Sequence, residues 1–190
     1  MKHNNALLST ILVMAFLLPL SVQATSDWQV LPVLKPSYKP DFAVAVLVGG
    51  MQADDDNKDK FSPAGLEVSL NCPLLKTPKH TIRQQISYTQ AETNGFKTKS
   101  FELSPHHMFK VGEKVTAGFG PSIGYTTVEN PDGDDSVVTY GLGASTRYDV
   151  TKKFFVGAEV RYVKAQEFEI ADKTTDFDNA RALVKLGYQF

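Results

Sequence analysis

The chain has 190 residues, 42% of them hydrophobic, and a formal net charge of −1 at pH 7. This length predicts a single domain, and the composition excludes a disordered acidic or basic chain and indicates no helical membrane span. The charge argues against a nucleic-acid partner, because no basic stripe is available to neutralise phosphates. The single cysteine, Cys72, cannot form an internal disulfide.

Residues 1–24 have the features of a secretory signal peptide. Lys2 provides a positive start, an apolar run extends from Ala6 to Leu20, and Val22-Gln23-Ala24 is similar to a cleavage site. The apolar run is shorter than the ~20 residues that a helical span requires, so an N-terminal anchor is the weaker interpretation. We therefore expect export and cleavage near Ala24.

Residues 25–40 contain Pro32, Pro36 and Pro40. Proline lacks the backbone donor that a sheet needs, so this density predicts an extended tether rather than a strand. We interpret the segment as an N-terminal periplasmic extension that leans on the folded domain, residues 41–190.

From residue 41 onward, apolar and polar residues alternate in short segments separated by turn residues. The predicted strands are 41–51, 64–72, 80–89, 97–109, 114–127, 137–149, 154–166 and 180–190. Their connections alternate in length: 52–63, 90–96, 128–136 and 167–179 are polar and longer, whereas 73–79, 110–113 and 150–153 are tighter. Long loops at one rim and short turns at the other indicate an antiparallel up-and-down barrel.

The last predicted strand has one face without any charge. Ala182, Val184, Leu186, Tyr188 and Phe190 share this face at a period of two. The closing Tyr188-Gln189-Phe190 resembles the assembly signal of Gram-negative outer-membrane β-barrels, and residues 41–190 resemble the small barrels of the OmpA-transmembrane-domain and OmpX type. The resemblance implies an all-β fold, an eight-stranded antiparallel up-and-down transmembrane β-barrel, in the outer membrane of a Gram-negative bacterium. It also implies that the barrel assembly machinery recognises the C-terminal strand.

The alternation places bulky apolar residues on one face of the barrel and polar residues on the other. Val160 and Leu142 belong to the apolar face, and Glu159 and Arg161 to the polar face. Eight strands enclose an interior just wide enough for side chains, so about thirty bulky apolar residues would overfill it. We therefore predict that the apolar face contacts lipid while charged residues and glycines fill the centre.

Three residues depart from this pattern. Gln84, Pro105 and His107 fall on the predicted lipid face, where membrane barrels usually avoid polar residues near the middle of the bilayer. Pro105 also predicts a bulge that could shift the phase of the fourth strand.

Aromatic residues recur eight positions apart on the predicted outward face, as in Phe101 and Phe109. Eight residues span roughly 26 Å along a strand, or about 20 Å after a tilt of ~40°, which matches a thin outer membrane. Aromatic residues favour both membrane–water interfaces, so two rings are expected. The periplasmic ring is Phe42, Phe109, Tyr148, Phe154, Tyr188 and Phe190, and the outer ring is Tyr88, Phe101, Tyr125, Tyr140 and Tyr162.

Charged residues on the inward face are expected to converge in the lumen. A buried charge without a partner costs several kcal/mol, so these residues must pair across strands. The resemblance to the OmpA-type barrel, whose interior is filled by such a network, implies a plug rather than a pore. The predicted network is Glu67, Arg83, Glu102, Arg147, Glu159, Arg161, Arg181 and Lys185.

No catalytic residue, cofactor or metal site is predicted. The acidic runs at 54–59 and 132–135 do not match the spacing of a calcium loop, and the side chains of His106 and His107 should point to opposite faces. We expect a structural or surface-interaction function, such as adhesion or envelope integrity. The expected partners are outer-membrane lipids and lipopolysaccharide, and the ligand of the outer loops stays open.

Two other functions remain open. A lipid A-modifying enzyme on the same scaffold would use histidine and serine near the outer rim, but His80, His106 and His107 all lie near predicted periplasmic turns. A soluble periplasmic ligand-binding barrel would instead turn its polar face to water.

Overall fold

The structure, a computed structural model, describes residues 28–53, 60–77, 81–93, 95–130, 133–166, 168–170, 173–175 and 178–190. The predicted signal peptide, the acidic run at 54–59, Asp132 and His80 lie outside these residues. No helix in the described part of the chain is long and apolar enough to cross a bilayer.

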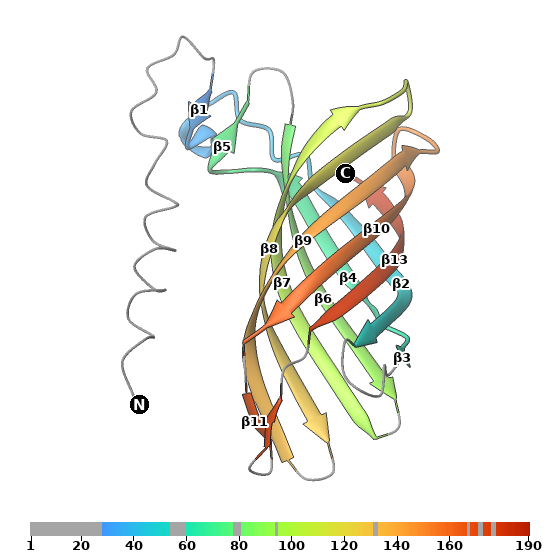
Figure 1. The fold of residues 1–190 in the computed structure, drawn as a ribbon. Helices are drawn as coiled ribbons and strands as arrows, with labels where there is room; N and C mark the ends of the chain where they lie inside the picture. The colour runs from blue at the N-terminus through green and yellow to red at the C-terminus, as the bar shows by residue number, and fades with distance from the viewer. Residues whose placement is uncertain are drawn as a thin grey trace.

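Eight antiparallel strands close into a barrel (Figure 1). Each strand pairs with the next along the chain, and the last pairs with the first from Asn179↔Ala53 to Gln189↔Ala43. The eight-stranded up-and-down prediction is therefore confirmed. The strands are β2 (Ala43–Ala53), β4 (Ala64–Asn71), β6 (Thr81–Thr93), β7 (Phe96–Lys110), β8 (Val115–Asn130), β9 (Gly133–Asp149), β10 (Phe154–Ala165) and β13 (Asn179–Gln189).

Shorter elements lie at the two ends of the barrel. β3 (Lys60–Phe61) pairs with β2, and β11 (Phe168–Ile170) pairs with β12 (Lys173–Thr175). At the opposite end, β1 (Gln29–Val30) pairs with β5 (Leu75–Lys76), and the 3-10 helix η1 (Pro32–Leu34) follows β1.

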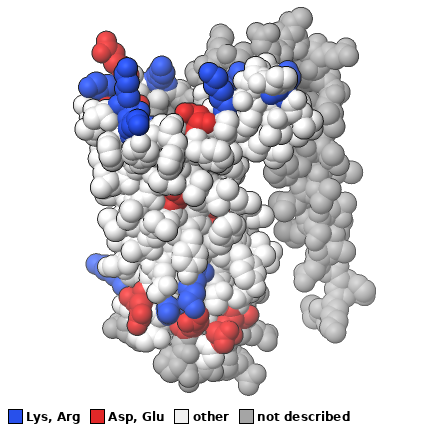
Figure 2. Space-filling view, turned by 180° about the vertical axis from the view of Figure 1, so that it is seen from behind, with Lys and Arg blue, Asp and Glu red and all other residues white. Residues whose placement is uncertain are grey.

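The outward face of the barrel is apolar. β2 buries Ala45 and Leu47 and exposes the valines at 44, 46 and 48. Leu142 is 71% exposed and Leu186 is 62% exposed, whereas Glu159 and Arg161 are buried. Figure 2 shows charged residues gathered at the two ends of the molecule and a wall between them that is almost free of charge. This is the predicted orientation and the reverse of a soluble barrel.

Two of the outer connections are shorter than predicted. The β6–β7 ladder runs to Thr93↔Phe96 and the β8–β9 ladder to Asn130↔Gly133, so only residues 94–95 and 131–132 connect these strands. Residues of the predicted connection pair with the strand beside them, as Ser136 does with Thr127 at 2.8 Å between the hydroxyl oxygens. The four strands β6–β9 therefore continue as a sheet beyond the rest of the wall (Figure 1).

The predicted bulge at Pro105 is wrong. The β7–β8 ladder pairs Leu103 with Ile123 and resumes at His107↔Phe119 in the same register, and the β6–β7 ladder is continuous past Gln84↔Pro105. A second proline, Pro121, occupies the opposing position on β8. Because neither proline has a backbone donor, the hydrogen-bond ladder is interrupted here, but neither strand contains the extra residue that defines a bulge.

The N-terminal segment folds back against the barrel instead of forming an extended tether. The Tyr38 hydroxyl donates to the Asn71 carbonyl at 2.6 Å, and the Asn71 side-chain amide donates to the Lys39 carbonyl at 2.9 Å. Cys72, which the alternation placed on the outward face, is buried beneath this segment because β4 ends at Asn71.

Two adjacent glycines in β2 provide a test of the closing seam between β2 and β13. A Cβ on Gly49 would meet the Ala182 carbonyl oxygen and lie 2.9 Å from the Leu183 Cα, both backbone atoms of β13, whereas a Cβ on Gly50 would have nothing within 4 Å. Gly49→Ala should therefore lower the free energy of unfolding by roughly 1–3 kcal/mol, and Gly50→Ala should change it by less than about 0.5 kcal/mol. Urea unfolding in lipid vesicles, followed by the mobility of unheated protein on gels, measures both. Equal effects of the two variants would contradict the seam geometry.

Candidate functional site

Six charged side chains form a continuous chain of ion pairs in the centre of the lumen. Lys185 pairs with Glu67 and, at 2.7 Å, with Glu159. Arg161 lies 2.8 Å from Glu159 and 3.7 Å from Glu102, which also pairs with Arg181. The three acids and three bases alternate along this chain and are all buried. Their charges cancel, so the centre of the barrel carries no net charge.

The alternation of side chains along each strand explains why these charged residues all point into the lumen. Glu159 and Arg161 are two positions apart on β10, and Arg181 and Lys185 are four apart on β13, so each pair shares the inward face. Arg161 and Arg181 stand directly opposite each other in the β10–β13 ladder. Like charges in this position are destabilising. Glu102, from β7 across the lumen, pairs with both arginines, and Glu159 supplies a second carboxylate to Arg161.

The structure separates two predicted members of the network from the other six. Arg83 and Arg147 lie toward the end of the barrel that carries the N-terminal segment, which is the predicted periplasmic end. There Arg83 pairs with Asp41 at 3.1 Å and Arg147 with Asp149 at 2.7 Å. Gln189 joins them, since its side-chain oxygen accepts from Arg147 at 3.0 Å and from Arg83 at 3.4 Å.

Several polar residues that contact the charged and polar groups of the barrel interior are absent from the predicted network. Gln189 could have been found, because it has the inward phase of Arg181 and Lys185. Asp41 and Asp149 lie at strand ends, where alternation along the strand no longer predicts whether a side chain points inward or outward. His106 is fully buried, and its Nδ1 lies 2.8 Å from the Ser145 hydroxyl.

Little space remains between the central charges and the periplasmic arginines. The cavity there has a volume of about 20 Å³, with Lys185, Arg83, Ser145 and Phe155 in its lining. This volume holds about one water molecule. Toward the outer end, two clusters of buried apolar residues lie inside the barrel. The first is Met51, Ala53, Phe61 and Ala91, and the second is Val128, Val137 and Ala165.

The structure places the predicted aromatic rings on the outward phase of their strands. In the outer ring, Tyr88, Phe101 and Tyr125 are direct ladder neighbours. In the periplasmic ring, Tyr188 packs edge-on against Phe154 and Phe190 at 5.2 and 5.1 Å between ring centroids. The outer ring occupies β6 to β10, and no predicted member lies on β13, β2 or β4.

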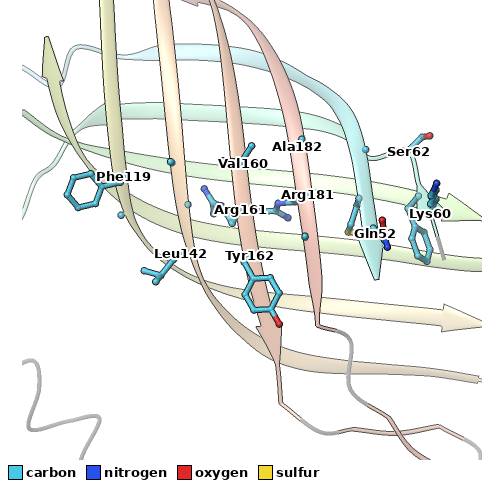
Figure 3. Close-up of a pocket in the computed structure, with 17 residues that line it drawn as sticks. Gln52, Lys60, Ser62, Phe119, Leu142, Val160, Arg161, Tyr162, Arg181 and Ala182 are labelled. Atoms are coloured by element: carbon cyan, nitrogen blue, oxygen red, sulfur yellow. The ribbon is translucent and has the colours of Figure 1, made fainter. Parts of the chain in front are cut away.

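A groove lies on the outer wall beside Tyr162 of the outer ring and extends over β13 and β2, where the ring has no predicted member (Figure 3). Its volume is about 1010 Å³. Small residues on β2 and β13 form part of its lining: Gly50, Ala180 and Ala182. Bulky residues border one side of the groove: Phe119, Leu142, Val160 and Tyr162. Polar residues border the other side: Gln52, Lys60 and Ser62. The groove therefore combines an apolar lining with the exposed lysine Lys60 on one side.

The described part of the chain holds no group of three His, Cys, Asp or Glu arranged for a metal ion. His106 points into the lumen, and the ring of His107 lies 6.2 Å from that of Phe119 on the outer wall. Consecutive strand residues thus point to opposite faces, so these two histidines do not share a site.

Lys185 should be the most sensitive charge of the central chain. Lys185→Met leaves Glu67 and Glu159 buried without their shared cation, and we expect a loss of about 3–5 kcal/mol in the free energy of unfolding. Lys164→Met is the matched control, because exposed Lys164 lies 3.8 Å from Asp178, and it should cost about 0–1 kcal/mol. The triple variant Glu67→Gln, Glu159→Gln, Lys185→Met should recover part of the loss. Urea unfolding in vesicles measures all three, and a Lys185→Met variant as stable as the control would refute the pairing.

No protein-family model matches the chain, and no curated protein matches it. Solved structures do match. The N-terminal β-barrel domain of Pseudomonas aeruginosa OprF superposes with a TM-score of 0.57 at 14% identity, over 80% of this chain and 100% of that one. Neisserial surface protein A superposes with a TM-score of 0.52 at 17% identity, over 78% of this chain and 95% of that one. Ail, the attachment invasion locus protein of Yersinia pestis, superposes with a TM-score of 0.50 at 13% identity, over 80% of this chain and 100% of that one. The chain therefore has the fold of the small eight-stranded outer-membrane β-barrels.

Proposed function

We propose that this protein is an integral outer-membrane barrel that displays a rigid four-stranded sheet at the cell surface for contact with a partner. The observation that carries the proposal is the extension of β6–β9 beyond the outer aromatic ring. Thr93 lies five residues past Tyr88, and Asn130 lies five residues past Tyr125. At ~3.3 Å per residue and a tilt of ~40°, the strands reach about 13 Å above the ring.

The projecting sheet is held by side-chain pairs on both faces. Lys99 forms an ion pair with Glu129, and the Ser100 and Thr126 hydroxyls lie 2.9 Å apart. Thr127 and Ser136 make a similar pair one strand further. A sheet ordered in this way loses little conformational entropy when a partner binds, which favours recognition.

The charge of this sheet bears on the class of partner. Its described residues carry Lys97 and Lys99 against a larger number of acids, namely Glu92, Glu129, Asp134 and Asp135. The structure of Ail has been solved in complex with the heparin analogue sucrose octasulfate. The acidic excess here does not favour a sulfated ligand of that kind, and it favours a partner that is basic or is bridged by cations.

The wall and the C-terminal strand suggest the membrane partners. We propose that the groove beside Lys60 holds an acyl chain of an outer-leaflet lipid such as lipopolysaccharide. We also propose that β13, which ends in the two aromatic residues of Tyr188-Gln189-Phe190, is the strand recognised by the assembly machinery after removal of residues 1–24.

The filled lumen supports a sealed barrel rather than a channel. The central ion pairs, the buried apolar clusters toward the outer end and the cavity of only about 20 Å³ beside Lys185 support this proposal. We therefore expect no steady conductance in planar-bilayer recordings of the folded protein. A stable open current from a homogeneous folded sample would contradict this expectation.

An enzyme that modifies lipid A is the second candidate, and the described residues do not favour it. The Ser145–His106 pair lies inside the barrel, where no lipid can reach it, and His107 lies toward the periplasmic end of β7. Mass spectrometry of lipid A from cells with and without the protein tests this candidate, which would require a change in acyl chains.

The orientation can be tested by cysteine labelling, because Cys72 is the only cysteine and can be replaced. In a Cys72→Ser background, Asp134→Cys should react with a membrane-impermeant maleimide on intact cells, since it lies in the projecting sheet. Lys114→Cys, in the turn between β7 and β8, should react only after the outer membrane is permeabilised. The reverse labelling pattern would invert the topology.

Shortening the sheet distinguishes surface interaction from a purely structural role. Two variants would remove residues 91–98 or 128–135 and join each strand pair by a two-residue turn, which leaves the outer aromatic ring in place. We expect both variants to assemble and to maintain resistance to detergents but to lose adhesion of the cells to their target surface. Full adhesion with both variants, measured at equal protein abundance, would restrict the function to envelope integrity.

A further inference from the structure

A small folded unit projects from the periplasmic end of the barrel. This unit, which we call the foot, comprises residues 28–40 and 72–77. β1 and β5 form its ribbon through Gln29↔Lys76 and Val30↔Leu75, and the Leu31 amide donates to the Leu74 carbonyl at 2.8 Å. Burial, with a smaller effect of the Cys72 thiol, raises the pKa of the Tyr38 hydroxyl, so this group stays protonated and donates to Asn71. The foot is thus tied to the end of β4.

The foot exposes more apolar surface than its size explains. Val30 and Leu75 are paired on one face of the ribbon, and Trp28, which directly precedes β1, is 54% exposed. Leu34, in η1, is 77% exposed. The exposed apolar residues of the foot are Trp28, Val30, Leu31, Val33, Leu34, Leu74 and Leu75. A group of this kind on so few residues indicates a binding surface.

The charge of the foot has one sign. Lys35, Lys39 and Lys76 are exposed, and neither 28–40 nor 72–77 contains an aspartate or glutamate. Lysines next to tryptophan and aliphatic residues are typical of protein segments that lie in the interface of an anionic membrane.

The position of the foot also points to the membrane. In Figure 1, β1 and β5 stand beside the end of the barrel rather than over its axis. The foot is at the end opposite the projecting sheet, close to the level where the uncharged wall gives way to charged residues (Figure 2). If the barrel spans the membrane as proposed above, this is the surface of the periplasmic leaflet.

We propose that the foot binds the anionic phospholipid surface of the periplasmic leaflet, with Trp28, Val30 and Leu34 inserted among the headgroups and the three lysines on phosphates. This inference rests on the proposed membrane orientation. It gives the protein a second attachment to the bilayer, outside the barrel wall.

Trp28 is the only tryptophan in the chain, so its fluorescence reports on the foot alone. The protein without residues 1–24 would be folded into vesicles of phosphatidylcholine with or without phosphatidylglycerol. With phosphatidylglycerol, Trp28 emission should shift to shorter wavelength, become quenched by brominated acyl chains and be protected from iodide. Water-like emission that iodide quenches in both kinds of vesicle would overturn the proposal.

The contribution of the lysines has its own variant and control. The triple variant Lys35→Gln, Lys39→Gln, Lys76→Gln should lower the ratio of shielded to exposed Trp28 by roughly a hundredfold, about fivefold for each lysine near an anionic surface. Lys97→Gln, in the projecting sheet, should leave the ratio unchanged. Anionic lipid would be overturned as the ligand if Trp28 were shielded as strongly in the triple variant as in the unchanged protein. The same conclusion would follow if shielding required an added periplasmic extract instead of phosphatidylglycerol.

The mobility of unheated protein on gels separates this inference from the proposed function. A folded, vesicle-embedded barrel with a water-exposed Trp28 would refute the foot alone. Failure of the barrel to insert into vesicles at all would refute the membrane orientation on which both proposals depend.

Discussion

The closed ring of backbone hydrogen bonds is the constraint on which the rest of the structure depends. In hydrocarbon, an unpaired backbone amide or carbonyl costs several kcal/mol, and a sheet can avoid such groups only by joining its last strand to its first. The β13–β2 ladder makes this junction, with Gly49 allowing the Ala182 carbonyl to approach. The ring has eight strands, so its interior is narrow, and alternation then sends every second side chain into that narrow space.

The polar lumen follows from this geometry. Charged groups cannot face lipid, and in the interior they are stable only when paired. The alternating chain from Glu67 to Arg181 meets this condition with three acids and three bases, while Arg83 and Arg147 pair with separate carboxylates nearer the N-terminal segment. The same ion pairs that stabilise the charged residues in the interior also occupy the centre of the lumen, so the stability of the barrel and its proposed closure have one physical origin.

The two ends of the barrel are free of the lipid constraint, and they differ. At one end, β6–β9 continue as a sheet because hydroxyl and charged residues can pair there in water. At the other end, the N-terminal segment packs on β5 and leaves an apolar, lysine-bearing surface uncovered. The wall is common to barrels of this size, so what distinguishes this protein lies in its ends and in the groove that interrupts its outer aromatic ring.

The sequence by itself determined the strand number, the antiparallel order and the inward or outward direction of most residues. These follow from a period of two read over eight segments, and lipid enforces that period strongly because one wrong phase exposes a charge. The length of the strands came from the folded structure, since polar segments such as 128–136 suit a loop and a paired strand equally well. The folded structure also decided which carboxylate each arginine meets, that Pro105 causes no bulge opposite Pro121, and that residues 28–40 fold back onto the barrel. Each of these depends on a partner distant in the sequence, and the local pattern of residues contains no information about that partner.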